Sequence, residues 1–312
     1  MSQEQQKFRL VTRSDFDGLV CAVLLNELKL IDDILFVHPK DMQDGKVAIT
    51  GRDITTNLPY VAAAHLVFDH HESETVRNTG ERANHIILAH APSAARVVYD
   101  HYGGKAAFPR MTDAMMDAVD KADSAQFSRD EILDPTDWPL LNYLMDSRTG
   151  LGRFREFRIS NYALMMDLIK YCADHGIDEI LELPDVRERV DLYFDHAARA
   201  KAQMLRCTTV HGNLAVLDLR GEETIWAANR FMIYALFPRS NISIHVLWGV
   251  QKQNTVLATG KSILNRDSKT NVGELMLKYG GGGHQAAGTC QVENDKADAV
   301  LAELITQINQ DG

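Results

Sequence analysis

The first half of the chain alternates short apolar runs with amphipathic segments, and this alternation restricts the fold more than any other feature. The apolar runs have strand length, and the segments between them carry apolar residues at helical spacing. Alternating strands and helices predict βαβ units and an α/β fold with a mostly parallel sheet flanked by helices. The expected strands are 7–13, 34–39, 46–53 and 65–69, and the expected helices are 18–28, 93–103 and 112–123.

The rest of the chain predicts a helical middle region, at 131–205, and a second α/β domain. We expect an N-terminal domain at 1–190, a linker helix at 191–206 and a smaller C-terminal domain at 207–312, with the active site in the cleft between the domains. The expected elements of the last third are a hairpin at 208–219, a helix at 224–237, strands at 243–250 and 255–263, a helix at 272–284 that runs into a glycine loop, and a helix at 296–309.

Composition excludes several classes of protein. The 312 residues are 45% hydrophobic, which fits a globular chain, and no apolar run is long enough to predict a membrane span. The N-terminus lacks the pattern of a signal peptide, so a cytoplasmic location is expected. A net charge of −10 argues against binding of long duplex nucleic acid, which needs a basic face. The scattered cysteines predict buried, reduced thiols: Cys21, Cys172, Cys207 and Cys290.

Carboxylates follow two of the expected strands at their carboxyl ends. Asp15 and Asp17 come directly after the first strand, and Gly18 lets the chain turn sharply enough for both carboxylates to face one site. Asp53 closes the expected strand 46–53, where it is either part of the same site or the cap of the segment that follows. Because ligands bind at this edge of a parallel sheet, the three aspartates are candidate metal ligands.

The strongest single signal is Asp69-His70-His71, at the end of the expected strand 65–69. Three consecutive metal-competent side chains at the end of a buried strand are costly to leave unpaired. The helix at 112–123 adds a further acid, and either Asp120 or Asp123 could be the ligand. Carboxylates with some imidazole favour Mn²⁺ or Mg²⁺ over a thiolate zinc site, and a bridging carboxylate would hold two ions close enough to activate water for phosphoryl chemistry.

A second set of candidate residues lies in the last third of the chain. Residues 280–288 contain four consecutive glycines followed by His284, and such a loop leaves backbone N–H groups open to a phosphate. Upstream, Ser262 and Arg266 place a hydroxyl and a guanidinium after an expected strand, and a guanidinium suits a bidentate grip on phosphate. The alternative interpretations are a flexible loop and ordinary surface charge.

The motifs DFDG, FDHH and GGGGHQAAG, in this order, resemble those of the DHH phosphoesterase superfamily over almost the whole chain. The resemblance implies a catalytic centre at Asp69, His70 and His71, two divalent ions (usually Mn²⁺, with Mg²⁺ or Co²⁺ as alternatives) and a homodimer. The implied metal ligands are Asp15, Asp17, Asp53, Asp69, His70 and Asp123. The implied substrate-binding residues are Arg266, Gly282, Gly283 and His284, to which we add Gly281, Ser262 and Arg13 from the residues themselves.

The sequence departs from the family pattern in two places. Many members carry a metal-binding histidine four residues before the first aspartate, and Val11 stands there in this chain, with Arg13 nearby as a cation beside the site. This departure puts the occupancy of one metal position in question. The interval between Asp53 and His70 is also short for the family, which weakens the assignment of Asp53.

We hypothesise that the chain is a metal-dependent phosphoesterase in which two ions activate a water molecule for attack on a short substrate. The resemblance allows oligoribonucleotides, linear or cyclic dinucleotides, nucleotide phosphates and polyphosphate, and is nearest to exopolyphosphatase-like members. The alternative is a catalytically impaired nucleotide or phosphate sensor, which the departure at Val11 motivates. A purely structural α/β scaffold is the third reading, and it would bind no divalent ion.

Overall fold

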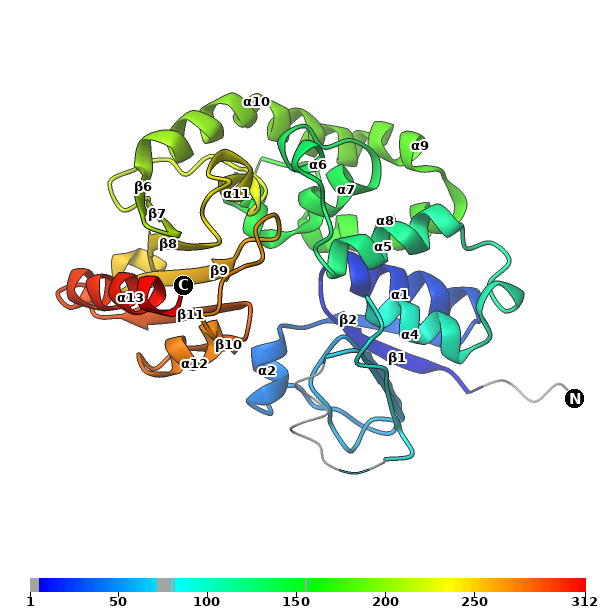
Figure 1. The fold of residues 1–312 in the computed structure, drawn as a ribbon. Coiled ribbons are helices and arrows are strands. Elements are labelled where there is room, and N and C mark those ends of the chain that lie inside the picture. The colour runs from blue at the N-terminus through cyan, green and yellow to red at the C-terminus, as the bar shows by residue number, and fades with distance from the viewer. Residues whose placement is uncertain (1–5, 72–79, 81, 155) are drawn as a thin grey trace, which may run out of the picture. The chain divides into compact units, whose positions relative to one another are not determined.

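The computed structural model describes residues 6–71, 80, 82–154 and 156–312, and the chain divides into two compact units. The change from the first unit to the second at Val190 falls inside the long helix α10 (Pro184–Cys207) (Figure 1). The first unit comprises Met1–Gln126, Thr136–Ser147 and Phe154–Val190, and the second comprises Phe127–Pro135, Arg148–Arg153 and Asp191–Gly312.

The first unit is built on a five-stranded parallel sheet in the order β2-β1-β3-β4-β5. The short apolar sequences of β1 and β4 are almost wholly buried, as expected for strands of a parallel sheet that is covered on both faces. Because all five strands run in the same direction, their carboxyl ends meet at one edge. The strands are β1 (Phe8–Thr12), β2 (Ile31–Phe36), β3 (Asp53–Thr56), β4 (Leu66–Asp69) and β5 (His85–Ile87).

Four helices of the first unit pack together, and Figure 1 shows them along one face of the parallel sheet. Helix α1 contacts the three others, and it is buried on almost all sides because its sequence is apolar nearly throughout. Three of the four begin at a Ser or Thr whose hydroxyl accepts a backbone N–H of the first turn. The helices are α1 (Phe16–Glu27), α4 (Ala94–His101), α5 (Asp113–Asp123) and α8 (Asn161–Asp174).

The expected strand at 46–53 is wrong. Val47 and Ile49 pack into an apolar cluster with Val11, Met42 and Leu58, so their alternation reflects packing rather than strand pairing. The hydrogen-bonded strand β3 begins only at Asp53.

The largely helical middle region is confirmed. It contains α7 (Asp137–Met145), α8, α9 (Ile177–Glu182) and most of α10, with the 3₁₀ turns η2 (Ser147–Thr149) and η3 (Leu151–Arg153). The remaining short elements, which begin before it, are α2 (Pro39–Gln43), α6 (Arg129–Leu133) and the turn η1 (Gly104–Ala106).

The second unit is built on a six-stranded mixed sheet in the order β10-β11-β9-β8-β7-β6, in which β7 and β8 are parallel and the other pairs antiparallel. Its core lies between this sheet and the helices α12 and α13. The strands are β6 (Thr208–His211), β7 (Leu214–Asp218), β8 (Ile242–Trp248), β9 (Thr255–Lys261), β10 (Gly282–His284) and β11 (Ala287–Val292), and the helices are α11 (Met232–Leu236), α12 (Val272–Leu277) and α13 (Ala297–Asp311), with the turn η4 (Val250–Lys252).

The expected helix at 224–237 is too long, because helix α11 covers only its last part. The backbone N–H groups before α11 bond to other segments instead: that of Trp226 to the Gln203 side chain and that of Ala228 to the Thr149 carbonyl. These tertiary hydrogen bonds replace the backbone hydrogen bonds of a helix.

The predicted fold class, α/β with a parallel sheet and a second, smaller α/β domain, is confirmed. Within the part of the chain that the structure describes, no helix is long and apolar enough to cross a membrane.

Candidate metal centre and active site

Three neighbouring strands of the first sheet bring candidate residues to its carboxyl edge. Strand β1 is followed by Asp15 and Asp17, β3 is followed by Asn57, and β4 ends at Asp69, with His70 next. Because β1, β3 and β4 are adjacent in this order, these residues form a row along the edge of the sheet. This is the edge at which parallel sheets bind ligands.

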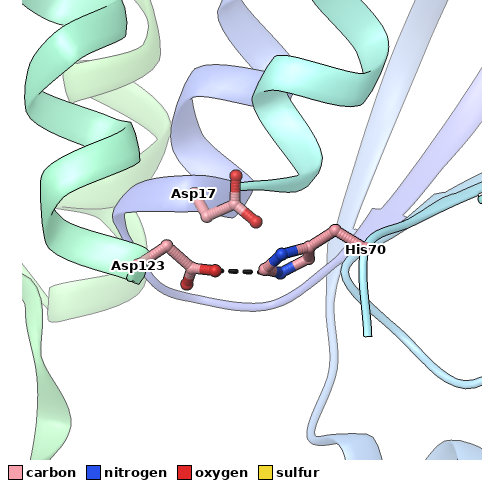
Figure 2. A group of neighbouring side chains, drawn as sticks. All are labelled: Asp17, His70 and Asp123. Carbon is pink, nitrogen blue, oxygen red and sulfur yellow. Dashed lines mark ion pairs between the residues drawn. The ribbon is translucent and has the colours of Figure 1, made fainter. Parts of the chain in front are cut away.

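Asp17, His70 and Asp123 converge at this edge (Figure 2). One ligand atom from each side chain lies within 4.8 Å of the other two, and His70 Nε2 lies 2.9 Å from Asp123 Oδ2. This contact has the distance of an ion pair but not the geometry of a hydrogen bond. Among the residues that the structure describes, this is the one group of three His, Cys, Asp or Glu side chains placed to share a metal ion.

The first backbone amides of helix α4 hold the carboxylate of Asp17. Oδ1 accepts the N–H of Ala95 at 2.8 Å, and Oδ2 accepts that of Ala94 at 3.1 Å. Asp17 is only 2% exposed. Burial raises the pKa of Asp17 well above its ordinary value, and the charge of Asp123 raises it further. A cation in this position would therefore favour the ionised form of Asp17.

Asp120, the other acid considered on α5, has a different role. Its carboxylate accepts the Ser93 hydroxyl at 2.7 Å and the Arg96 guanidinium at 2.6 and 2.9 Å. Ser93 in turn caps helix α4 by accepting the N–H of Arg96 at 3.0 Å. Asp120 thus fixes the helix end that holds Asp17, and the structure brings Asp123, not Asp120, to His70.

The carbonyl of Ala91 orients the ring of His70. It lies 3.1 Å from Nδ1 and can only accept, so Nδ1 carries a proton and Nε2 is the nitrogen near Asp123. Burial lowers the pKa of His70, but the contact with Asp123 and the charges of Asp123 and Asp17 outweigh burial and raise it to about 9. Burial likewise raises the pKa of Asp123, but His70 holds it below its ordinary value. The site is therefore built around a positive charge.

Asp69 lies beside this group and holds His71. Its Oδ1 accepts the backbone N–H groups of His70 at 2.8 Å and His71 at 3.2 Å, and lies 2.7 Å from His71 Nδ1. Its Oδ2 is buried and has no hydrogen-bond partner among the residues that the structure describes, which is a costly state for a carboxylate oxygen. The His71 side chain is 41% exposed, so its ring is open to solvent or to a substrate.

Asp15 caps helix α1 and pairs with Arg13. Its Oδ1 accepts the N–H of Gly18 at 3.0 Å, and its Oδ2 lies 3.0 Å from Arg13 Nε. A Cβ atom at Gly18 would lie 2.1 Å from the carbonyl oxygen of Arg13, so the turn requires glycine because of this close approach. Asp15 and Asp17 do lie at the same sheet edge, but only Asp17 belongs to the group of three.

The structure places Asp53, one of the expected metal ligands, away from the group of three. Asp53 is the first residue of β3, not the end of a strand, and it pairs in register with Arg9 on β1. It therefore lies at the amino edge of the sheet, where it accepts Arg9 Nε at 2.7 Å and the N–H of Thr50 at 2.6 Å. Burial opposes ionisation of Asp53, but these donors hold its pKa below the ordinary value.

Asn57 is the residue that follows β3 at the carboxyl edge, and the sequence reasoning missed it. It is 1% exposed, and its φ of 55° lies in the left-handed region, which asparagine tolerates better than most residues. Its N–H donates to the carbonyl of Phe68 at 3.1 Å, but neither polar atom of its side chain has a hydrogen-bond partner in the described part of the chain. The β-branched run 54–56 directly before it is the signal that could have placed the strand end here.

The candidate residues after β9 in the second unit differ in their surroundings. Ser262 is buried, and its hydroxyl accepts the N–H groups of Leu264 at 3.2 Å and Asn265 at 3.0 Å. The hydroxyl of Ser262 therefore shapes the turn, and this explains its presence without a substrate. Arg266 is exposed, and its Nε donates to the carbonyl of Ile263 at 3.1 Å.

The glycine-rich segment is a short strand rather than the expected loop. Residues Gly282–His284 form β10, which pairs antiparallel with β11. A Cβ atom at Gly281 would lie 2.2 Å from the Thr289 carbonyl oxygen, and one at Gly283 would lie 2.3 Å from that of Ala287. The glycines are needed because the two backbones approach so closely.

His284 lies at the exposed end of β10. The N–H of Lys261, at the end of β9, donates to the carbonyl of Ala286 at 2.8 Å, which joins the β10–β11 turn to the end of β9. The segment that leads to Arg266 starts from this same end of β9. Arg266 and His284 therefore belong to one end of the second sheet.

The donor set of the first unit fits a divalent ion. Two carboxylates and one imidazole converge, and the Nδ1 contact to a carbonyl is the usual support for a metal-binding histidine. The unpartnered Oδ2 of Asp69, in the same row, is a further oxygen that a cation or its bound water would satisfy. Carboxylate oxygens with one imidazole suit Mn²⁺ and similar ions better than an all-oxygen set would.

Comparison with known proteins identifies the family. The chain matches the structure of a pGpG-specific phosphodiesterase, PggH, from Vibrio cholerae, with a TM-score of 0.86 and 67% identity over 98% of this chain and 100% of that chain. It shares its fold with RecJ from Thermus thermophilus, solved in complex with Mg²⁺, with a TM-score of 0.51 and 13% identity over 98% of this chain and 50% of that chain. No family model and no curated protein matches. The expected resemblance is confirmed, and the chain belongs to the DHH phosphoesterase superfamily.

Proposed function

We propose that this chain is a metal-dependent phosphodiesterase that hydrolyses a short linear dinucleotide of the pGpG type. The observation that carries the proposal is 67% identity over nearly the whole chain to a pGpG-specific phosphodiesterase. The net charge of −10 also favours a small substrate over long nucleic acid. Polyphosphate and longer oligoribonucleotides, which the sequence left open, become the alternatives to test.

We place the metal at Asp17, His70 and Asp123. A divalent ion held there would supply Lewis-acid activation of water and would neutralise charge on the phosphate. The protein orients these ligands in advance, because the α4 amides hold Asp17 and the Ala91 carbonyl holds His70. We propose Mn²⁺ as the preferred ion, with Mg²⁺ and Co²⁺ as the alternatives.

We assign His71 to the reacting phosphate. Its Nδ1 donates to Asp69, which fixes the orientation of the ring. The remaining ring nitrogen can then donate a hydrogen bond to a phosphoryl oxygen or to the departing oxygen. Asp69 holds this ring and the two backbone N–H groups next to it, so it also fixes the local conformation of the chain.

We propose that Arg266 and His284 bind the rest of the substrate. Both side chains are exposed and belong to one end of the second sheet, and a guanidinium suits the terminal phosphate of a linear dinucleotide. In this view the residues before 191 form the catalytic domain, α10 provides the linker, and the residues from 207 onward form the substrate-binding domain. A cytoplasmic location and a homodimer stay predictions.

The test is product release by purified protein with Mn²⁺. Equal concentrations of pGpG, a second linear dinucleotide, an oligoribonucleotide, guanosine 3′,5′-bisphosphate and polyphosphate are offered, and products are separated by anion exchange. We expect pGpG to have a kcat/KM at least about tenfold above the others, a difference of about 1.4 kcal/mol in transition-state binding. Cleavage of the P–O3′ bond gives guanosine 5′-monophosphate alone, whereas cleavage on the other side gives guanosine and the bisphosphate.

Asp69→Ala is the control for this test. It removes the carboxylate that holds His71, so we expect turnover to fall below detection. Turnover that persists in Asp69→Ala would contradict the assigned site. If wild-type protein binds Mn²⁺ but turns over none of the substrates, the phosphodiesterase proposal fails and the sensor alternative is favoured.

A further inference from the structure

A neutral side chain occupies the middle of the acidic row at the sheet edge. Asn57 follows β3, which lies between β1 and β4, so it stands between the acids that follow those two strands. Two divalent ions a few ångströms apart repel each other strongly, and a negatively charged bridging ligand is what offsets this repulsion. The amide of Asn57 has no charge and cannot supply it.

A resident cation already lies on one side of this position. The Arg13 guanidinium is 3.0 Å from Asp15 Oδ2, and Asp15 Oδ1 is bonded to the N–H of Gly18. Both oxygens of Asp15 are thus engaged within the protein. A second ion would have to displace Arg13 from Asp15 and would then lie beside a guanidinium, which repels it.

The donor half of the Asn57 amide points to the same conclusion. Among the described residues, neither Oδ1 nor Nδ2 of Asn57 has a hydrogen-bond partner. Oδ1 could bind a cation without adding charge, but a metal ion cannot satisfy the Nδ2 donor. Arg13 is the accessible donor of the row, because its side chain is 30% exposed and its N–H groups suit a phosphoryl oxygen. The guanidinium of Arg13 is therefore suited to bind a substrate phosphate, a task that a second ion would otherwise perform.

We propose that this site binds a single divalent ion, on Asp17, His70 and Asp123, that Arg13 binds the substrate phosphate in place of a second ion, and that the uncharged Asn57 leaves no bridging ligand for one. The proposal rests on the metal-dependent phosphodiesterase proposed above. The family resemblance implies two ions, and we propose one instead. Two observations support it. In the described part of the chain, only one group of three metal-competent side chains converges, and Arg13 already pairs with Asp15.

The first test counts ions without any substrate. Full-length protein is stripped with a chelator, equilibrated with Mn²⁺, passed through a desalting column and analysed for metal per chain. We expect one Mn²⁺ per chain and the electron paramagnetic resonance spectrum of isolated Mn²⁺. Two Mn²⁺ per chain with an exchange-coupled spectrum would overturn the proposal.

The second test tries to create the missing ion site. The double variant Arg13→Gln/Asn57→Asp removes the resident cation and adds the bridging charge. We expect it to bind two Mn²⁺ per chain with an exchange-coupled spectrum. The matched control is Asp53→Asn, which changes an aspartate at the opposite edge of the same sheet and should keep one ion. A double variant that folds and still binds one ion would show that Arg13 and Asn57 are not what excludes the second.

The third test separates phosphate binding from metal binding. Arg13→Gln should still bind one Mn²⁺, with an affinity equal to or above that of the wild type, while kcat/KM for pGpG falls about 100-fold. Loss of the ion in this variant would contradict a role in substrate binding. If pGpG proves not to be the substrate, the ion counts of the first two tests still decide the proposal, because they need no turnover.

Discussion

Two histidines, one in each unit, show how neighbouring groups decide what an imidazole can do. His70 follows β4 and lies 2.9 Å from Asp123, and the acids around it raise its pKa to about 9 against the effect of burial. His245 lies on β8, in register with Leu217 and Ala258 of the adjacent strands, and burial lowers its pKa to about 4. Burial acts in the same direction on both rings, so the carboxylates make the difference.

The same contrast separates the candidate residues of the two units. In the first unit, Asp17, His70 and Asp69 are each held by backbone N–H or C=O groups and are largely buried. In the second, Arg266 and His284 are exposed at the end of the sheet. We infer that the first unit supplies interactions that the transition state requires, and that the second supplies substrate affinity. Mutation should therefore affect kcat in one unit and KM in the other.

The largest effect is expected for Asp123→Asn. The substitution keeps the shape of the side chain but removes the charge that faces His70, so we expect loss of Mn²⁺ binding and a fall in kcat/KM of about 10³-fold or more. Metal analysis and kinetics on the same preparation check both parts. Asp117→Asn, an exposed aspartate on the same helix, is the control and should behave as wild type. An Asp123→Asn variant with normal Mn²⁺ content would remove Asp123 from the metal site.

A smaller effect, on KM rather than on kcat, is expected for Arg266→Ala. Removal of an exposed guanidinium should raise KM for pGpG about 10- to 100-fold and change kcat by no more than a few-fold. Steady-state kinetics over a wide range of substrate concentrations gives both constants. Lys269→Ala, an exposed cation nearby, serves as the control. If Arg266→Ala instead lowers kcat at constant KM, the division of labour between the two units is wrong.

The sequence predicted the fold well where one physical signal dominated. The buried runs of β1 and β4 and the capped amphipathic helices α4 and α5 lie close to their expected ranges. Prediction failed where packing imitates a secondary-structure pattern. Val47 and Ile49 alternate as in a strand, but they fill an apolar cluster instead. The segment before α11 has helical periodicity, but its N–H groups bond to distant residues.

The candidate site was predicted in part for the same reason. Asp17 and His70 follow strands that are easy to recognise, so their meeting at one edge could be predicted. Asp53 was assigned to the wrong edge because the start of β3 was taken for the end of a strand. Asn57 was missed for the same reason. Its side chain is uncharged, and what distinguishes it is a buried amide that has no hydrogen-bond partner among the described residues. Burial and the absence of a hydrogen-bond partner cannot be read from the sequence alone.

The difference between the two histidines also predicts how metal binding depends on pH. A histidine must lose its proton to bind a metal, and His70 in the metal-free chain holds its proton until about pH 9. Below that pH, Mn²⁺ must displace one proton, so affinity should rise by up to about tenfold per pH unit between pH 6.5 and 8.5. Calorimetry in buffers of different ionisation enthalpy should show release of about one proton per Mn²⁺. A Mn²⁺ affinity that is constant over this range would contradict the environment described for His70.

The smallest effect concerns His245, which should matter for stability alone. Its folded-state pKa, about 4, lies below its ordinary value of 6.5, so between these values the unfolded chain binds more protons than the folded one. Stability should therefore fall as pH drops from 6.5 to 4, by up to about 3 kcal/mol from this group. His245→Leu should abolish this part of the acid sensitivity, whereas His90→Gln, at an exposed histidine, should not. Urea unfolding at pH 7.5, 5.5 and 4.5 measures the difference. An equal loss of stability on acidification in His245→Leu and wild type would show that His245 is not kept neutral by burial. The contrast with His70 would then rest on the acids of the first unit alone.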